Sequence, residues 1–397
     1  MCQRRVAVVF LEYLPTHEFK DQGMYIRALI KAGYDAFLVT ADKPELANYT
    51  SSDYEVVRVH KEDVLSGGIW DALAVDAVLG INWFSRHFLS AAQDLCRRNI
   101  PLVIKADTDG FASPRLWLRE SLRRYLHQSR DGHLNLGAAG KIIGRALIPG
   151  PFDRRLLAVV ECSAAVIVET TAALANVQRF VVYYGRHDLM DRLQLVCNPV
   201  DSVFTDASLE PRKKAQVILI GRWDDYQKNT RIAIRAVYQF LETQRHYTAI
   251  VTGTGTDKWH LAQRRYAQDL THRVSIYEHL PHRTLMDILA QSQMLLSASF
   301  FEGSPLAMAE ALCCGTTVVG TPIPATDHFI ENGRFGTRAV GFHWRGLVEA
   351  LREEALRWDL GTRDPASISN YWVAKLRYES ISKQLQGILE ARWFRPS

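Results

Sequence analysis

Two glutamates stand on either side of a short segment whose residue types suit the start of a helix. Residues 300–310 read FFEGSPLAMAE, so Glu302 and Glu310 flank a Gly-Ser-Pro. Ser304 is a favourable N-cap, and Pro305 suits the first helical position because the backbone N–H that proline lacks has no helical partner there. The remaining free N–H groups and the positive end of the helix dipole predict an anion site suited to phosphate.

Carboxylates beside an anion site must bind something other than the anion. They repel phosphate, but they accept hydrogen bonds well, and sugar hydroxyls are donors. Glu302 precedes the expected helix, whereas Glu310 lies farther along the helix axis, by roughly 1.5 Å for each residue. A ligand with a diphosphate in the middle and a polyol at each end fits this layout. A nucleotide sugar is such a ligand, with a hexose at one end and a ribose at the other.

The flanking residues predict the elements that position this segment. The run MLLSAS (294–299) is typical of a buried strand, and good helix formers from Leu306 to Leu312 are followed by Gly315 as a stop signal. A strand, a tight loop and a helix in this order place the anion site at the carboxyl edge of a sheet. Ligands of open α/β sheets bind at that edge.

Short apolar runs alternate with amphipathic, helix-length segments along most of the chain. Helical patterns run from Met24 to Lys31 and from Thr230 to Thr243. This alternation predicts parallel sheets with helices on both faces. We expect an α/β chain with two doubly wound, Rossmann-like domains (1–200 and 201–368), a polar linker after Pro199, and one long amphipathic helix within 369–397. The expected strands are VAVVFL (6–11), DAFLVT (35–40), DAVLGI (76–81), LVIKA (102–106), AAVIVE (164–169), QVILIG (216–221), YTAIVTG (247–253), MLLSAS (294–299) and TTVVGT (316–321).

Composition narrows the class of protein. The 397 residues are 47% apolar and 23% charged, which is ordinary for a globular protein. No apolar run approaches the roughly 18 to 20 residues that span a bilayer, and the first apolar run is interpreted as a buried strand rather than a signal peptide. The six cysteines include no CxxC pair and no histidine at zinc spacing. Reduced thiols in a cytoplasmic protein are therefore expected.

One basic segment accounts for the excess positive charge. Residues 115–155 contain nine Lys or Arg and three Asp or Glu, which is 9 − 3 = +6 against +5 for the whole chain. Apolar residues such as Leu116, Trp117 and Leu122 are interspersed among the cations. A helix with an apolar and a cationic face suits docking on an anionic membrane surface, and a solvated basic helix is the alternative. Nucleic-acid binding is not expected, because no recognition module is visible.

The segment FEGSPLAMAEALCCGTTVV resembles the E-x7-E signature of the family 4 retaining glycosyltransferases, which share the two-Rossmann type B (GT-B) fold. Other segments follow the same family's order and spacing: LVCNPVDSVF (195–204), VILIGRWDDYQKNTRIAIRAV (217–237), and VSIYEHLPHRTLMDILAQSQMLL (274–296). The resemblance covers essentially all of residues 195–335. The N-terminal half is similar in pattern only. The resemblance implies an acceptor-binding first domain and a nucleotide-sugar-binding second domain that face each other across a cleft, with the C-terminal helix crossing back to pack on the first domain.

The resemblance implies a role for each matching position. Glu302 would contact the donor hexose and Glu310 the ribose. Arg222 and Lys228 would hold the diphosphate, helped by backbone N–H groups of the segment from Gly303 to Leu306. The backbone near His279 and Leu280, together with Gly23 and Gly253, would complete the donor site. The full set of implied donor-side positions is Glu302, Arg222, Lys228, Gly23 in the loop after the first strand, Gly253 in the VTGTGT turn, His279 and Leu280 at the base edge, Gly303, Ser304, Pro305, Leu306 and Glu310.

The chain departs from the family where a histidine is common near the reaction centre. That place reads KADTDG, and Asp107 replaces the histidine. Three interpretations of Asp107-Thr-Asp109 stay open. The two carboxylates could bind a metal ion, as Asp-x-Asp does in metal-dependent glycosyltransferases of another fold. One of them could touch the acceptor, or the segment could be a plain Asp-Gly turn.

The expected function is the retaining, metal-independent transfer of a hexose from a UDP- or GDP-linked donor to a hydroxyl of a saccharide or lipid-linked saccharide. No cofactor is expected, and the departing phosphate oxygen itself would take the acceptor's proton. Synthesis of a bacterial cell-surface polysaccharide or glycolipid is the expected setting, in the cytoplasm or at the inner face of the membrane. The alternatives are a nucleotide-sugar epimerase of related fold and a non-catalytic subunit that keeps the fold.

Overall fold

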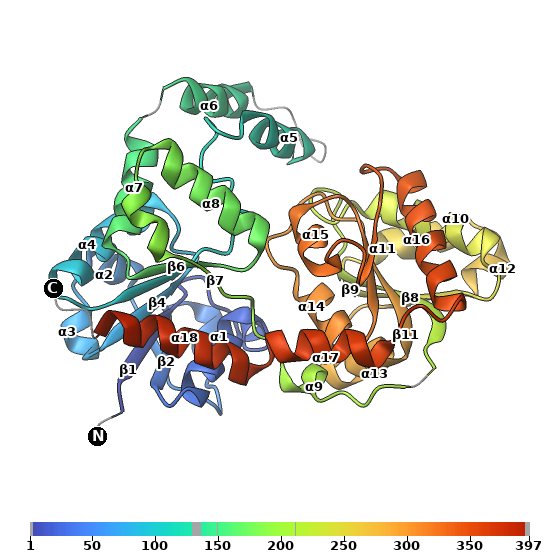
Figure 1. Ribbon diagram of the computed structural model, residues 1–397, viewed down its shortest axis with the longest axis horizontal. Helices are drawn as coiled ribbons and strands as arrows, with labels where there is room; N and C mark the ends of the chain where they lie inside the picture. Colours follow the sequence, from blue (N-terminus) through green and yellow to red (C-terminus); the bar gives the residue numbers. More distant parts are fainter. Residues whose placement is uncertain (1–2, 129–135, 149, 211, 394–397) are drawn as a thin grey trace. The chain divides into compact units, whose positions relative to one another are not determined.

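The computed structural model describes residues 3–128, 136–148, 150–210 and 212–393. The chain divides into two compact units (Figure 1). The N-terminal unit contains the described residues before Ser202, apart from the end of the helix at 118–128, together with the stretch from Arg377 onward. The C-terminal unit is formed mainly by Ser202–Leu376. Among the described helices, none combines the length and the apolar character needed to cross a bilayer.

The described strands of the N-terminal unit form a seven-stranded parallel sheet in the order β3-β2-β1-β4-β5-β6-β7. The interior strands are buried along nearly their whole length, as expected for strands covered on both faces. The strands are β1 (Arg5–Val9), β2 (Asp35–Ala41), β3 (Val56–Val59), β4 (Ala77–Ile81), β5 (Leu102–Lys105), β6 (Ala165–Val168) and β7 (Leu193–Leu195).

Helices pack on both faces of this sheet. Along β1, Val6 and Val8 belong to a core shared with α1 and α18, whereas Ala7 and Val9 belong to a core shared with α4, α7 and α8. This alternation follows from the two-residue period of a strand. The helices are α1 (Asp21–Lys31), α2 (Lys61–Ser66), α3 (Trp70–Leu73), α4 (Leu89–Arg97), α5 (Leu118–Gln128), α6 (Leu136–Leu147), α7 (Pro151–Cys162), α8 (Thr171–Tyr183) and α18 (Tyr378–Trp393).

The described strands of the C-terminal unit form a second parallel sheet, with six strands in the order β10-β9-β8-β11-β12-β13. The strands are β8 (Lys214–Arg222), β9 (Thr248–Thr254), β10 (Val274–Tyr277), β11 (Ser292–Ser297), β12 (Thr317–Gly320) and β13 (Gly336–Arg338). The helices are α9 (Ser202–Thr205), α10 (Thr230–Thr243), α11 (Asp257–Gln263), α12 (Gln268–Thr271), α13 (His282–Gln291), α14 (Leu306–Cys313), α15 (Pro324–Ile330), α16 (Trp344–Asp359) and α17 (Pro365–Leu376).

The two doubly wound sheets confirm the fold class expected from the sequence. Every strand that was predicted from an apolar run is present in the structure. The helix predicted at 230–243 begins and ends at the predicted residues. Four strands were not expected: β3, β7, β10 and β13. All four are edge strands of three or four residues, which give little periodic signal.

The expectation of one long C-terminal helix was wrong, because the helical stretch is interrupted at Arg377. α17 is part of the C-terminal unit and α18 part of the N-terminal unit. As expected, the last helix packs on the N-terminal unit. Ile381 lies in the core next to α1, and the Ser382 hydroxyl donates to the Ala28 carbonyl at 2.6 Å. Lys31 of α1 also pairs with Glu379.

The polar segment after Pro199 is more structured than a linker. Phe204 of α9 is buried, and Lys213 is buried just before β8. The Lys213 ammonium donates to the carbonyls of Ala290 at 2.7 Å and Cys314 at 2.9 Å. These carbonyls lie at the ends of α13 and α14, where cations are favoured by the helix dipole. Lys213 therefore holds α14 in place from its C-terminal end.

Gly253 lies where two central strands approach closely. It pairs with Gly221 across β8 and β9, and its φ is +129°, a conformation that residues with a Cβ rarely adopt. A Cβ at this position would lie 1.8 Å from the Gly221 carbonyl oxygen. That contact is with backbone, so a side-chain rotation could not relieve it.

We therefore expect Gly253→Ala to destabilise the C-terminal unit by on the order of 2–4 kcal/mol, through backbone strain and overpacking. Chemical unfolding followed by tryptophan fluorescence measures this. Gly387→Ala in α18 is the control, because its Cβ would meet nothing within 4 Å. The control should be neutral or slightly stabilising, since alanine favours a helix. An unchanged midpoint for Gly253→Ala would contradict the packing argument.

Candidate functional site

The helix after β11 begins one residue later than the sequence predicted. Its N-cap is Pro305, with ψ of 116°, and not Ser304. The helix therefore starts at Leu306, because the extended ψ of Pro305 is incompatible with a first helical turn at that residue. The Pro305 carbonyl accepts from Met308 N at 3.1 Å and Ala309 N at 3.4 Å. The stop signal was correct, since Gly315 has φ of +71° and follows the last turn.

The Glu302 carboxylate is buried and held by three donors. Its Oε1 atom accepts from Lys228 Nζ at 2.6 Å and from Ser299 Oγ at 2.7 Å. Its Oε2 atom accepts from Gln227 Nε2 at 3.0 Å. A carboxylate offers about four lone-pair positions. These bonds occupy three of them, which leaves Oε2 able to accept one more hydrogen bond.

The loop that carries Lys228 is shaped by Asp224. The Asp224 Oδ1 atom accepts from the backbone N–H of Gln227 at 2.6 Å and of Lys228 at 3.2 Å, and Oδ2 lies 3.1 Å from Arg222 Nε. Burial opposes ionisation of Asp224, but these donors outweigh it and lower the pKa of the carboxyl below its ordinary value. The Gln227 carbonyl accepts from Phe300 N at 2.8 Å. The loop after β8 is thereby joined to the loop after β11.

Sequence reasoning missed three residues of this arrangement: Asp224, Gln227 and Ser299. A signal for Asp224 was present, because an aspartate at the head of a loop commonly accepts from N–H groups two or three residues on. No local pattern marks Gln227 and Ser299. The contact of Gln227 with Glu302 depends on the pairing of β8 with β11, which are distant in the sequence, whereas Ser299 contacts Glu302 within the same loop.

The candidate donor residues of the C-terminal unit line up along one sheet edge. Strands β10, β9, β8 and β11 are adjacent in that order, and all run parallel, so their carboxyl ends lie at the same edge. His279 and Leu280 follow β10, and the Gly253 N–H of β9 donates to the Glu278 carbonyl of the same loop at 2.8 Å. Arg222 ends β8 with a side chain that is 70% exposed. The loop with Glu302 and the start of α14 follow β11.

The type of chemical group presented along this edge changes from one strand to the next. Backbone and loop groups of β9 and β10 come first, then the cations after β8, then the carboxylate and the helix start after β11. Glu310 lies within α14 and is buried. An elongated ligand with a diphosphate between two hydroxyl-bearing groups matches this array of groups. The donor roles assigned to these residues from the sequence stay predictions.

The two sequence-predicted residues of the N-terminal unit lie in different settings. Gly23 was expected in a loop, but it is in the first turn of α1. A Cβ there would lie 2.2 Å from the Glu18 carbonyl oxygen, so Gly23 allows the preceding loop to pack on the helix. Asp107 follows β5 with φ of +44°, and its N–H donates to Glu169 Oε1 at 3.1 Å.

Asp109 has a structural role in a turn. It is buried, its Oδ1 atom accepts from Phe111 N at 3.3 Å, and its carbonyl accepts from Asn176 Nδ2 at 2.9 Å. Gly110 follows with φ of +82°. These contacts match the Asp-Gly turn interpretation for Asp109, whereas Asp107 is held by different groups.

A buried lysine lies at the centre of a carboxylate cluster that the sequence analysis did not anticipate. Lys105 has no exposed side-chain surface, and its Nζ atom lies 2.7 Å from Asp21, 2.9 Å from Glu169 and 3.6 Å from Asp107. The sequence feature that could have indicated this cluster is the lysine within the otherwise apolar run LVIKA. We name these four residues the Lys105 cluster. Within the described ranges, no group of three or more His, Cys, Asp or Glu could hold a metal ion.

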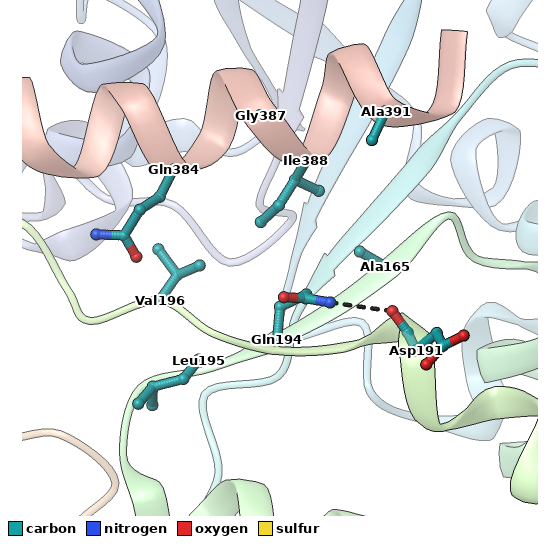
Figure 2. A pocket seen from close by; sticks show the side chains of 9 residues that line it. All are labelled: Ala165, Asp191, Gln194, Leu195, Val196, Gln384, Gly387, Ile388 and Ala391. Carbon is teal, nitrogen blue, oxygen red and sulfur yellow. Dashed lines mark hydrogen bonds between the residues drawn. The ribbon is translucent and has the colours of Figure 1, made fainter. Parts of the chain in front are cut away.

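A cavity of about 330 Å³ lies elsewhere in the N-terminal unit (Figure 2). It is bordered by the segment Asp191–Val196 and by residues of α18 from Gln384 to Ala391. Its lining includes no lysine or arginine that could balance a diphosphate, and it includes none of the sequence-predicted site residues. The sequence-predicted site residues therefore lie outside this cavity.

Comparison with known proteins agrees with this arrangement. Residues 214–355 match the family described as Glycosyl transferases group 1. One component of the phosphatidylinositol N-acetylglucosaminyltransferase of Arabidopsis thaliana is 24% identical over 130 residues, which are 32% of this chain and 29% of the length of that protein. The chain thus aligns with less than a third of this relative.

Two solved structures have a similar fold over nearly the whole chain. Anabaena Alr3699/HepE, solved in complex with UDP, has a TM-score of 0.68 and 13% identity, with 98% of this chain and 100% of that chain covered. A glycosyltransferase from Rickettsia africae ESF-5 has a TM-score of 0.72 and 11% identity, with 100% of both chains covered. At these identities the likeness concerns the fold.

The family match lies on the part of the chain that holds the E-x7-E segment, the Arg222–Lys228 loop and the β8–β13 sheet, and the fold is that of two Rossmann-like units. Through residues 214–355, the chain is therefore similar to the family described as Glycosyl transferases group 1.

Proposed function

We propose that this protein transfers a hexose from a UDP-linked donor to a hydroxyl acceptor, with retention of configuration at the anomeric carbon. The observation that carries the proposal is the linear array along the carboxyl edge of β10, β9, β8 and β11, with the Glu302 carboxylate fixed next to Lys228. Similarity to this family supports the reaction type. The UDP in the Anabaena structure of similar fold supports a uridine nucleotide as the donor's leaving group.

In the proposed reaction, the bond between the anomeric carbon and the diphosphate oxygen breaks, and its electron pair stays on that oxygen. The acceptor oxygen forms the new bond on the same face of the sugar, and the acceptor's proton passes to the departing phosphate oxygen. The growing negative charge needs fixed positive groups. Arg222 is exposed at the sheet edge, and the free N–H groups at the start of α14 add the helix dipole. Lys228 donates one of its three protons to Glu302 and has the others to offer the diphosphate.

The carboxylates recognise the two sugars. We assign the remaining acceptor position of Glu302 Oε2 to a hydroxyl of the hexose. Because Lys228 and Ser299 fix Oε1, the carboxylate need not reorganise when the sugar binds, and a sugar lacking that hydroxyl leaves a buried acceptor unsatisfied. Glu310, farther along α14, is assigned to the ribose. The exposed loop with His279 and Leu280 is assigned to the base.

Asp107 is the proposed acceptor contact. Its carboxylate is the partly exposed member of the Lys105 cluster, whereas Asp21 and Glu169 are buried. The left-handed backbone of Asp107 is held by the bond from its N–H to Glu169, so the side chain is fixed at the carboxyl end of β5. Asp107 would accept a hydrogen bond from the attacking hydroxyl and orient it, without taking its proton.

A saccharide or lipid-linked saccharide of a cell-surface polysaccharide or glycolipid pathway is the proposed acceptor class, reached from the cytoplasmic face of a membrane. A nucleotide-sugar epimerase is the alternative reaction on a similar fold, and a non-catalytic subunit is the second. Incubation with donor alone separates them: an epimerase converts the donor into its epimer, a transferase releases only the nucleotide and free hexose slowly, and a non-catalytic subunit binds without turnover.

A panel of UDP-, GDP- and ADP-sugars tests the donor in a thermal-shift assay. UDP-hexoses are expected to raise the melting midpoint, because a ligand that binds only the folded protein stabilises it. UDP alone should account for most of the shift, since the diphosphate makes the charged contacts. A shift with GDP-sugars and none with UDP-sugars would reject the proposed donor.

Substitution of the Glu302–Lys228 pair tests the site. Glu302→Gln and Lys228→Ala are each expected to lower UDP release from UDP-hexose by on the order of 100-fold, the usual effect of losing a fixed charge-stabilising group. Calorimetry with UDP should show weaker binding for Lys228→Ala and little change for Glu302→Gln. Lys375→Ala is the control, because Lys375 also pairs with a glutamate, Glu331 at 2.9 Å, away from the proposed site. Wild-type turnover in both site variants would overturn the assignment.

The Lys105 cluster predicts a specific pH dependence of stability. Burial raises the pKa of Glu169, Lys105 opposes this, and Asp107 adds to it. Because the folded pKa lies above the ordinary value of 4.5, the carboxyl stabilises the fold while protonated, and this contribution is lost as pH rises through the folded pKa. The unfolding free energy of Glu169→Gln minus that of wild type should therefore become more positive as pH rises above 4.5.

Glutamine keeps the Oε1 atom that accepts from the Asp107 N–H, so the variant is expected to remain folded. Glu161→Gln is the control: Glu161 is an exposed partner of Arg186, with a separation of 3.1 Å. Its difference from wild type should not rise with pH in this way. Denaturant titrations at several pH values measure both variants, and a flat profile for Glu169→Gln would contradict the buried cluster.

A further inference from the structure

Helix α6 of the N-terminal unit has no buried side chain among those that the structure describes. Its sequence is LGAAGKIIGRAL, and each described position is exposed or half-buried. An apolar helix ordinarily covers its apolar face with other elements. In Figure 1, α6 is drawn beyond α7 and α8, away from the strands of its unit. The apolar side chains of α6 therefore need another explanation.

Exposed apolar residues continue from α6 onto the end of α8. Leu147 is 72% and Ile148 71% exposed, and Ile143 is also exposed. On α8, Val182 and Tyr183 are exposed as well. Arg115 connects the two places: its Nε atom donates to Tyr183 Oη at 2.5 Å, and its Nη1 atom donates to the Leu147 carbonyl at 3.4 Å. We call Ile143, Leu147, Ile148, Val182 and Tyr183 the apolar patch.

Several cations lie on or beside the elements that carry the apolar patch. Lys141 and Arg145 lie on α6, and Arg115 bridges α6 and α8. Arg145 and Arg86 both lie over the Phe152 ring, at 4.1 Å and 3.4 Å from its centroid. Within the described part of the chain, none of these four cations forms a salt bridge.

The neighbouring carboxylate is hydrogen-bonded to hydroxyl groups. Asp153 of α7 is buried and accepts from Ser113 Oγ and from Tyr184 Oη, at 2.5 Å each. The patch thus presents apolar side chains next to cations that form no salt bridge with the described residues. Such a combination of apolar and cationic side chains suits a binding surface with an anionic outer layer and an apolar interior.

We propose that the apolar patch and its cations dock the N-terminal unit on an anionic lipid bilayer. Leu147, Ile148 and Ile143 enter the boundary between headgroups and acyl chains, Tyr183 lies at headgroup level, and Lys141, Arg145 and Arg115 contact lipid phosphates. A lipid surface is favoured over a second copy of the chain, because a like-charged patch would have to face itself in a twofold contact. The proposal narrows the membrane partner of the proposed function to described residues of α6 and α8, and it does not require the transfer reaction.

Sedimentation with lipid vesicles tests the proposal on the full-length chain. Wild type is expected to pellet with vesicles of phosphatidylglycerol and phosphatidylcholine, to bind pure phosphatidylcholine vesicles much more weakly, and to be released by high salt, because exposed charges are screened. L147E/I148E should lower the bound fraction at least about tenfold, and K141Q/R145Q should weaken binding and reduce its salt dependence. V340E is the matched control, because Val340 is an equally apolar residue that is 81% exposed on the C-terminal unit.

Three outcomes would overturn the docking proposal. They are no binding of wild type to anionic vesicles, equal binding to neutral vesicles, and unchanged binding by L147E/I148E. Sedimentation velocity without lipid examines the competing occupant: a dimer that L147E/I148E dissociates, in the absence of vesicle binding, assigns the patch to a second copy. UDP calorimetry on the same proteins keeps the two proposals separate. Intact UDP binding without vesicle binding rejects only the docking, and vesicle binding without UDP binding rejects only the transferase.

Discussion

The ion pair between Lys228 and Glu302 is the interaction on which the sheet edge of the C-terminal unit depends. Its atoms are 2.6 Å apart, and both side chains are largely removed from water, where a charge without a partner is costly. Lys228 follows β8 and Glu302 follows β11, so the pair joins the loops of two adjacent strands. Gln227 and Ser299 complete the set of donors around the carboxylate. A carboxylate held in this way is in place before any sugar arrives, and preorganisation of that kind is what electrostatic catalysis requires.

Strand order turns this local pair into a longer site. Because all strands of the C-terminal sheet are parallel, each loop that leaves a carboxyl end meets the same edge. The order β10-β9-β8-β11 then arranges loop backbone, cations and carboxylate in one sequence. Lys213 donates to the carbonyls of Ala290 and Cys314 and so holds the C-terminal end of α14. The start of α14 thereby keeps its position at that edge. The parts of the site that bind charge are thus held by contacts outside the site.

The sequence predicted those features that local pattern determines. Glu302, the helix after it and its end at Gly315 follow from residue type and spacing over a few positions. The start of that helix was misplaced by one residue, because proline is compatible with both the N-cap and the first turn, and only its ψ decides. The interruption at Arg377 also escaped prediction, since both flanking segments have helical periodicity. Contacts between distant segments could not be predicted from local pattern. The partners of Lys105 are Asp21 in α1, Asp107 after β5 and Glu169 after β6, and no spacing in the sequence connects them.

The two sheet edges differ in electrostatic character: cations and carboxylates are paired at the edge of the C-terminal sheet, whereas carboxylates outnumber the cation at the edge of the N-terminal sheet. At the edge of the C-terminal sheet, Arg222 pairs with Asp224 and Lys228 pairs with Glu302, and the start of α14 adds the positive end of a helix dipole. At the edge of the N-terminal sheet, one ammonium faces three carboxylates, so the Lys105 cluster is negative or holds a shared proton. Burial raises the pKa of Asp21 and Glu169, which is the expected response to such crowding. A phosphate would be repelled by this edge, whereas a hydroxyl group finds acceptors there. This difference supports the proposal that the nucleotide diphosphate binds to the C-terminal unit and that a neutral, hydroxyl-bearing group binds at Asp107.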